Sequence, residues 1–237
     1  MTTPEITLYT NKACPFAQRV EIAFLEAGVD VNKFQVNLQV KPEWYAPQVN
    51  PASKVPAIAF GGPKVEPDKP SPDSTKIAES LVLLEFVADL YPHAHLLPAT
   101  PVERAKTRFF IDAVSTKVLP AYFAFVLRGE APDKLFAALE DAQALLPPTG
   151  FAVGENFTIA DAAVAPFLGR ADIMLKNDLG KFDAGAGVAV HKEIFQGGRF
   201  SRLQKYYADI TARPSWKATF DEDFLVDYTK SKTLKKL

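Results

Sequence analysis

Apolar and polar positions alternate along the first part of the chain in a way that predicts strand, helix and strand in that order. Glu5–Tyr9 alternates with period two, which is typical of a half-buried strand. From Pro15 onward apolar residues recur every three or four positions until Gly28, which predicts one amphipathic helix. Phe34–Leu38 alternates again. A strand, a helix and a second strand in succession favour parallel pairing of the two strands.

The pattern then changes from alternation to turns and a second helix. Pro42–Tyr45 predicts a short helix or turn, and Val55–Phe60 predicts a third strand that carries a proline near its start. Gly61–Ser74 contains two glycines and four prolines, which predicts a surface loop because proline lacks the amide that a sheet interior needs. Ser80–Tyr91 has helical periodicity and ends before a proline.

Beyond residue 101 nearly every segment has helical periodicity, with prolines 120 and 166 as expected kinks. The expected helical segments are Glu103–Leu127, Asp133–Leu146, Thr158–Leu175, Leu203–Ala212 and Ser215–Phe220. The lysine-rich tail Thr229–Leu237 predicts a frayed terminus. We therefore expect an α/β domain over residues 1–92, a linker over 93–101, and an all-α domain over 102–237.

Composition and charge exclude several classes of protein. Hydrophobic residues make up 48% of the chain and charged residues 23%, which is typical of a globular protein. The net charge of −1 provides no overall field for nucleic acid or an anionic membrane. No apolar run approaches the ~20 residues of a membrane helix, and the first residues do not resemble a secretory signal. We therefore expect a soluble, cytoplasmic protein.

The sequence offers little for a metal or disulfide site and one candidate nucleophile. It contains one cysteine and three histidines, so neither an internal disulfide nor a Cys/His zinc site is expected. Cys14 stands where the first loop meets the first helix, directly before Pro15, which is favoured in the first turn of a helix. The unpaired amides and positive dipole of a helix start favour thiolate over thiol. The alternative is a buried, inert cysteine, which is the commoner role of this residue type.

A set of short motifs resembles the Omega class of glutathione transferases, in the thioredoxin-like superfamily. The resemblance covers roughly residues 5–220. A two-cysteine redox motif would have its second cysteine at position 17, where this chain has Ala17, so no local disulfide can form. The motifs, in chain order, are Cys14-Pro15-Phe16-Ala17-Gln18-Arg19, Lys41-Pro42-Glu43-Trp44, Asn50-Pro51, Val55-Pro56, Glu79-Ser80 and Phe157-Thr158-Ile159-Ala160-Asp161. The loop between Gly61 and Asp73 is longer than the hairpin connection usual in the family.

The resemblance implies a thioredoxin-like domain followed by an all-helical domain, the glutathione transferase fold, with glutathione as co-substrate and no metal. It implies that Cys14 is the catalytic thiolate and that the Val55–Pro56 bond is cis. Glutathione would contact Phe16, Lys41, Val55, Pro56, Glu79 and Ser80. Candidate walls for an apolar substrate are Phe110, Tyr122, Phe123 and Trp216. The family also implies a homodimer.

Two functional classes remain open, and most candidate residues also have a structural interpretation. The first class is a thiol transferase and reductase acting on glutathionylated molecules, glutathionyl conjugates or dehydroascorbate. The second is a non-catalytic binding protein for apolar small molecules. An intracellular chloride-channel-like protein is disfavoured because charges interrupt the first helix. Thr158 and Asp161 predict a capping box that serves folding, and Arg19 is as consistent with a solvent-facing residue as with a local positive charge.

Overall fold

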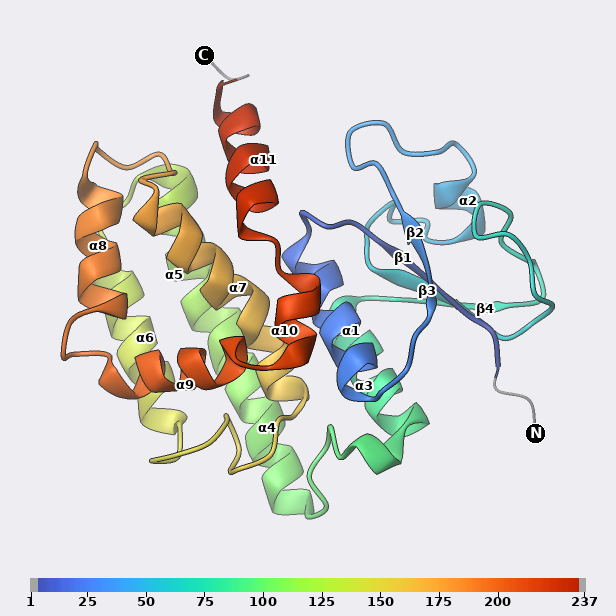
Figure 1. Cartoon of the computed structure of the whole chain (residues 1–237), viewed down its shortest axis with the longest axis horizontal. Helices are drawn as coiled ribbons and strands as arrows, with labels where there is room; N and C mark the ends of the chain where they lie inside the picture. Colours follow the sequence, from blue (N-terminus) through green and yellow to red (C-terminus); the bar gives the residue numbers. More distant parts are fainter. Residues whose placement is uncertain (1–3, 235–237) are drawn as a thin grey trace. The chain divides into compact units, whose positions relative to one another are not determined.

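The computed structural model describes residues 4–234 and divides into two compact units, Met1–Leu96 and Leu97–Leu237 (Figure 1). The first unit contains the sheet, and the second unit is helical. This confirms the expected fold class. The finer boundaries at residues 92, 93 and 101 stay predictions.

The first unit is a four-stranded sheet with the strand order β2-β1-β3-β4. Strands β1 and β2 are parallel, as the sequence predicts, whereas β1 with β3 and β3 with β4 are antiparallel. Helices α1 and α3 pack against each other. The elements of this unit are β1 (Ile6–Thr10), α1 (Pro15–Glu26), β2 (Asn32–Gln35), α2 (Tyr45–Gln48), β3 (Ala57–Phe60), β4 (Thr75–Ala78) and α3 (Ser80–Leu90).

The two faces of the sheet have different cores because side chains alternate along each strand. Tyr9 pairs with Ala57 on one face, and both belong to a buried cluster that contains Tyr45 of α2. Leu8 pairs with Ile58 on the opposite face, and both side chains are fully buried.

Two strands differ from the sequence expectation. Strand β2 covers Asn32–Gln35 rather than the predicted Phe34–Leu38. Only residues 32–35 pair with β1, whereas the alternating sequence pattern extends to Leu38. Strand β4 was not predicted at all. Its sequence, T-K-I-A, is short and only partly buried, so it has no apolar alternation by which to recognise it.

The proline-rich loop between β3 and β4 is held at several points by hydrogen bonds. The Tyr9 hydroxyl donates to the Pro67 carbonyl oxygen at 3.0 Å. Lys76 Nζ donates to the carbonyl oxygens of Ser71 at 2.6 Å and Ser74 at 3.0 Å. The loop is therefore tied to both β1 and β4.

The second unit is built from helices, of which α7 is almost entirely buried. Its helices are α4 (Pro101–Ala113), α5 (Leu119–Arg128), α6 (Asp133–Leu145), α7 (Ile159–Lys176), α8 (Ala186–Phe195), α9 (Ser201–Thr211), α10 (Pro214–Thr219) and α11 (Glu222–Leu234). Helix α7 continues through Pro166 rather than ending there.

A π-helical turn joins α4 to α5 where the sequence predicts a kink at Pro120. The wider turn spans Val114–Val118 and ends two residues before Pro120, whose missing amide cannot complete the regular ladder. The whole stretch Pro101–Arg128 is long and apolar enough, by length and composition, to cross a membrane, which corrects the expectation that no segment approaches that size. Half of its most apolar part is buried, as in the core helix of a globular protein.

The N-terminus of α7 carries the predicted capping box, which this structure confirms. The Thr158 hydroxyl oxygen accepts from the Ala160 amide, and the Asp161 carboxylate accepts from the Thr158 amide at 2.7 Å. Asp161 is fully buried and also accepts from the Ala152 amide and the Tyr206 hydroxyl, each at 2.8 Å. The carboxylate therefore joins α7, α9 and the loop before α7.

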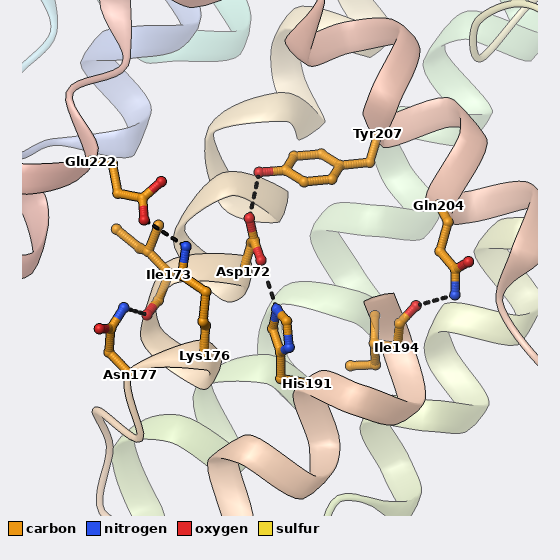
Figure 2. A network of polar contacts seen from close by, with 9 residues as sticks. All are labelled: Asp172, Ile173, Lys176, Asn177, His191, Ile194, Gln204, Tyr207 and Glu222. Carbon is orange, nitrogen blue, oxygen red and sulfur yellow. Dashed lines mark hydrogen bonds and ion pairs between the residues drawn. The ribbon is translucent and has the colours of Figure 1, made fainter. Parts of the chain in front are cut away.

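A second carboxylate, Asp172, which is partly buried, joins three helices of the same unit (Figure 2). It contacts His191 Nε2 of α8 at 2.7 Å and accepts from the Tyr207 hydroxyl of α9 at 3.2 Å. Burial, followed by the charge of Asp172, raises the pKa of Tyr207. Lys176, one turn farther along α7, donates to Glu222 of α11 at 2.6 Å (Figure 2).

Helices α8 and α11 were missed by sequence analysis. Helix α8 follows Gly185, whose φ is 83°, and contains a further glycine, so its sequence favours a loop. The lysine-rich tail was expected to be frayed, which is wrong for residues 229–234 because they continue α11. Residues 235–237 of that expectation lie outside the described chain.

Removal of the buried cap should destabilise the protein more than removal of an exposed one. We expect Thr158→Ala to lower the free energy of unfolding by about 0.5–2 kcal/mol. Asp161→Ala should cost more, because it leaves buried donors on Ala152 and Tyr206 without an acceptor. Urea unfolding measures both. Thr100→Ala, which removes the exposed cap of α4, is the matched control, and an equal loss in all three variants contradicts the prediction.

Candidate functional site

Cys14 lies at the N-cap position of α1, as its place before Pro15 predicts. Its backbone is extended, with φ −85° and ψ 116°, and Pro15 follows as the first helical residue. Asn11 shapes the preceding loop, since its side chain accepts from the Ala13 amide at 2.9 Å and donates to the Val36 carbonyl oxygen at 2.8 Å. The thiol is therefore held at the positive end of a helix.

The Cys14 sulfur lies beside the loop that precedes β3. Its Sγ is 3.8 Å from the Val55 carbonyl oxygen, within the range of a weak S–H hydrogen bond. The Val55–Pro56 peptide bond is cis, as the family resemblance implies. The sulfur and the Val55 backbone thus lie next to each other.

Side chains from three positions hold this loop in place. The Tyr45 hydroxyl and the Asn50 amide both donate to the Lys54 carbonyl oxygen, at 2.7 and 2.9 Å. Lys41 Nζ donates to the Ser53 carbonyl oxygen. Sequence analysis missed Tyr45 as a supporting residue, because its partner lies nine residues later in a loop whose shape no local pattern reveals.

Tyr45 belongs to an aromatic cluster near Cys14. It consists of Tyr9, Phe34, Trp44 and Tyr45, whose neighbouring ring centroids lie 5.3 to 6.1 Å apart. Cys14 packs against the buried core that includes Tyr9 and Tyr45. Burial raises the pKa of Tyr45, and the charges of Tyr9 and Cys14 add to this effect. The Tyr45 hydroxyl therefore remains a neutral donor at ordinary pH.

Glu79 and Ser80 stand at the start of α3, in the same unit. Ser80 is buried, whereas the Glu79 side chain is exposed. Glu79 is the N-cap residue and has a φ of 71°, a conformation that residues other than glycine rarely adopt. Such strain costs of order 1–3 kcal/mol and is concentrated at functional sites.

Arg19 is buried, whereas sequence analysis left open whether it faces solvent or adds a local positive charge. Only 2% of its surface is exposed, and its Nη1 donates to the Ser80 hydroxyl oxygen at 3.1 Å. Burial lowers the pKa of Arg19 to about 10, while the negative charge of Cys14 acts in the opposite direction. Its spacing of three and four residues from Ile22 and Ala23 was a signal for a shared buried face.

Phe16, which was predicted to contact glutathione, is 39% exposed. The Arg19 guanidinium carbon lies 5.2 Å from the centroid of its ring, which is cation–π geometry. An exposed ring two residues after Cys14 is available to a ligand.

The four candidate walls of an apolar substrate site do not form one cavity within the helical unit. Phe110 lines a cavity of about 490 Å³, and Tyr122 lines a separate one of about 30 Å³. The rings of Tyr122 and Phe123 are neighbours at 5.5 Å. Trp216 stacks on Phe220 at 4.3 Å instead. Their role in substrate binding stays a prediction.

Within residues 4–234, which the structure describes, no group of three or more His, Cys, Asp or Glu side chains could hold a metal ion. The site itself brings together one sulfur, a buried guanidinium and the backbone of the loop before β3.

Comparison with known families gives matches to both units of the chain. A model described as "Glutathione S-transferase, N-terminal domain" matches residues 8–95, and one described as "Glutathione S-transferase, C-terminal domain" matches residues 103–209. Among curated proteins, glutathione S-transferase omega-1 of Sus scrofa is 28% identical over 182 residues, which cover 73% of this chain and 70% of the relative.

Solved structures give higher similarity. Glutathione transferase Omega 1C from Trametes versicolor is 55% identical, with a TM-score of 0.94 and 96% of each chain covered. Omega 2C from the same organism is 57% identical, with a TM-score of 0.93, and the match covers 96% of this chain and 98% of that one. Omega 2S, solved in complex with 2,4-dihydroxybenzophenone, is 44% identical at a TM-score of 0.92, over 97% of this chain and 100% of that one.

The buried Tyr9 hydroxyl predicts a loss of stability at alkaline pH. Burial, together with the charge of Asp68, raises the pKa of Tyr9 from 10.0 to about 12. Between these values the unfolded chain loses this proton while the folded chain keeps it, so the free energy of unfolding falls as pH rises. Urea unfolding on both sides of pH 10 measures the slope. Tyr9→Phe should have a shallower slope than the native chain, and identical slopes contradict the prediction.

Proposed function

Because the chain belongs to the Omega class of the glutathione transferases, we propose that it acts as a glutathione-dependent thiol transferase and reductase through a mixed disulfide on Cys14. The broader activity, a glutathione transferase with glutathione as co-substrate, follows from the family. The observation that supports the finer proposal is the Cys14 sulfur at a helix N-cap, 3.8 Å from the Val55 carbonyl oxygen.

Glutathione binds along the loop that precedes β3 in this proposal. The Val55 amide and carbonyl pair with the backbone of its cysteinyl residue, in the manner of an added antiparallel strand next to Pro56. This brings the glutathione sulfur towards Cys14. Phe16 covers the bound peptide with its exposed ring.

The charged ends of glutathione have matching groups in the first unit. The start of α3 offers backbone amides and the Ser80 hydroxyl to the γ-glutamyl carboxylate. The exposed Glu79 carboxylate pairs with the γ-glutamyl ammonium. Lys41 pairs with the glycyl carboxylate, since an ammonium has three donors and only one is needed at Ser53.

The reaction proceeds by two thiol–disulfide exchanges. The Cys14 thiolate attacks the glutathionyl sulfur of a mixed disulfide, which forms a Cys14–glutathione disulfide and releases the substrate thiolate, protonated by water. The thiolate of a second glutathione then attacks this disulfide, which releases glutathione disulfide and restores the Cys14 thiolate. The same thiolate can attack the sulfur of a phenacyl-glutathione conjugate, which forms the Cys14–glutathione disulfide, breaks the carbon–sulfur bond and releases the ketone as an enolate that water protonates. A second glutathione then restores Cys14 as above. Reduction of dehydroascorbate to ascorbate, with two glutathiones oxidised to glutathione disulfide, is a further proposed activity.

The alternative, a non-catalytic binding protein for apolar molecules, has less support. It would leave the placement of Cys14 and the strained conformation of Glu79 without a role. Homodimerisation, cytoplasmic localisation and the lack of nucleic-acid or membrane partners stay predictions.

Replacing the nucleophile should exchange one chemistry for another. We expect Cys14→Ser to lose turnover of a glutathione–hydroxyethyl mixed disulfide, because a hydroxyl cannot form the covalent intermediate. The variant should gain conjugation of glutathione to electrophiles, since a hydroxyl can stabilise the glutathione thiolate. Coupled assays measure both reactions, and a thermal shift with glutathione controls for binding. Disulfide turnover that persists in the variant contradicts the proposal.

Loosening the loop beneath the site should weaken glutathione binding. Tyr45→Phe removes one hydrogen bond to the Lys54 carbonyl oxygen, worth about 0.5–1.5 kcal/mol. We expect the KM for glutathione to rise about two- to tenfold, with a smaller change in kcat. Tyr91→Phe is the matched control, because the structure gives its hydroxyl no hydrogen bond in the described chain. Unchanged KM in Tyr45→Phe shows that the loop does not need this support.

A further inference from the structure

The buried Arg19 side chain joins the two helix starts that the proposed glutathione site uses. It projects from α1, five residues after Cys14, and donates to Ser80 in the first turn of α3 at 3.1 Å. Its guanidinium also lies over the exposed Phe16 ring. Sequence analysis left open whether Arg19 adds a positive charge near Cys14 or faces solvent, and it gave no link to Ser80.

The direction of the hydrogen bond between Arg19 and Ser80 determines what the serine can offer to a ligand. A guanidinium has donors and no acceptor, so the Ser80 oxygen must accept from Arg19. The hydroxyl proton of Ser80 is therefore directed elsewhere, and a positive charge next to the oxygen makes it a stronger donor. A serine prepared in this way is suited to bind an anion.

Arg19 also lies near Cys14 on α1: Cys14 is the N-cap residue, and the buried Arg19 stands in the second turn with its guanidinium over the ring of Phe16. Its charge therefore acts close to the Cys14 sulfur. The negative charge of Cys14 raises the pKa of Arg19 against the opposing effect of burial. This interaction is reciprocal, so the guanidinium favours the thiolate form of Cys14 over the thiol. A buried cation interacts more strongly than an exposed one because solvent screens it less.

We propose that Arg19 is a positioning residue with two effects: it holds Ser80 as a hydrogen-bond donor for the γ-glutamyl carboxylate, and it stabilises the Cys14 thiolate. The assignment rests on the proposed function of the site. Arg19 acts through Ser80 and Cys14 and does not itself react. The single residue thus couples recognition of the substrate to activation of the nucleophile.

Three variants separate the two effects. Cys14 is the one cysteine of the chain, so the rate of iodoacetamide alkylation reports its thiolate directly. Arg19→Met should shift the alkylation–pH profile upward by about one pH unit and raise the KM for glutathione. Ser80→Ala should raise the KM and leave the profile in place. Arg19→Lys should keep the profile close to native, because the charge remains, but raise the KM, because a point charge replaces the planar donor.

A structural role alone would give a different result. Arg202→Met is the matched control, since Arg202 donates to the Pro147 and Gly150 carbonyl oxygens in the helical unit. It should lower stability without moving the alkylation profile. If Arg19→Met does not fold, Arg19→Gln keeps a donor and removes the charge, and it should also shift the profile upward. A native profile in the folded neutral variant, or an unchanged KM in Arg19→Met or Arg19→Lys, overturns the assignment.

Failure of the proposed function gives a separate outcome, because alkylation needs no turnover. If the native chain does not turn over the mixed disulfide, the proposed function fails, whatever the profile of the Arg19 variants. If the native chain turns over the disulfide and the neutral Arg19 variant has the native profile, only the role of Arg19 is overturned.

Discussion

The contact between the Cys14 sulfur and the Val55 carbonyl oxygen is the constraint on which the rest of the site depends. One side of the contact is set by the start of α1 at Pro15, and the other by the loop that precedes β3. A shift of the start of α1, or of the loop before β3, would separate the sulfur from the Val55 backbone, which is proposed to pair with glutathione. The catalytic proposal and the binding proposal therefore depend on the same short distance.

The side chains around this contact have two roles: one supports the loop by a hydrogen bond, and another supplies a positive charge. Tyr45 supports the loop from below, through a hydroxyl that remains neutral because burial raises its pKa. Arg19 supplies a buried positive charge on the side of α3. By contrast, the buried carboxylate of Asp161 and the partly buried carboxylate of Asp172 are engaged with donors from several helices, so they stabilise the helical unit rather than act on a ligand.

Local sequence patterns predicted the features that local chemistry determines. A cysteine directly before a proline predicted the N-cap of α1, and Thr158 with Asp161 predicted the capping box of α7. Arg19 could not be placed in this way, because its partner Ser80 lies 61 residues away. Strand β4 is recognisable only from its ladder with β3, and its own residues lack an apolar pattern. The walls of an apolar substrate site were not predictable either, since aromatic residues at helical spacing serve the core equally well.

The central claim is that Cys14 accepts a glutathionyl group and gives it up to glutathione. Intact-protein mass spectrometry after exposure to glutathione disulfide tests it most directly, because the chain has one cysteine and any disulfide adduct must be on Cys14. We predict one glutathionyl adduct that added glutathione removes completely. A chain that forms no adduct, or one whose adduct resists glutathione, contradicts the account.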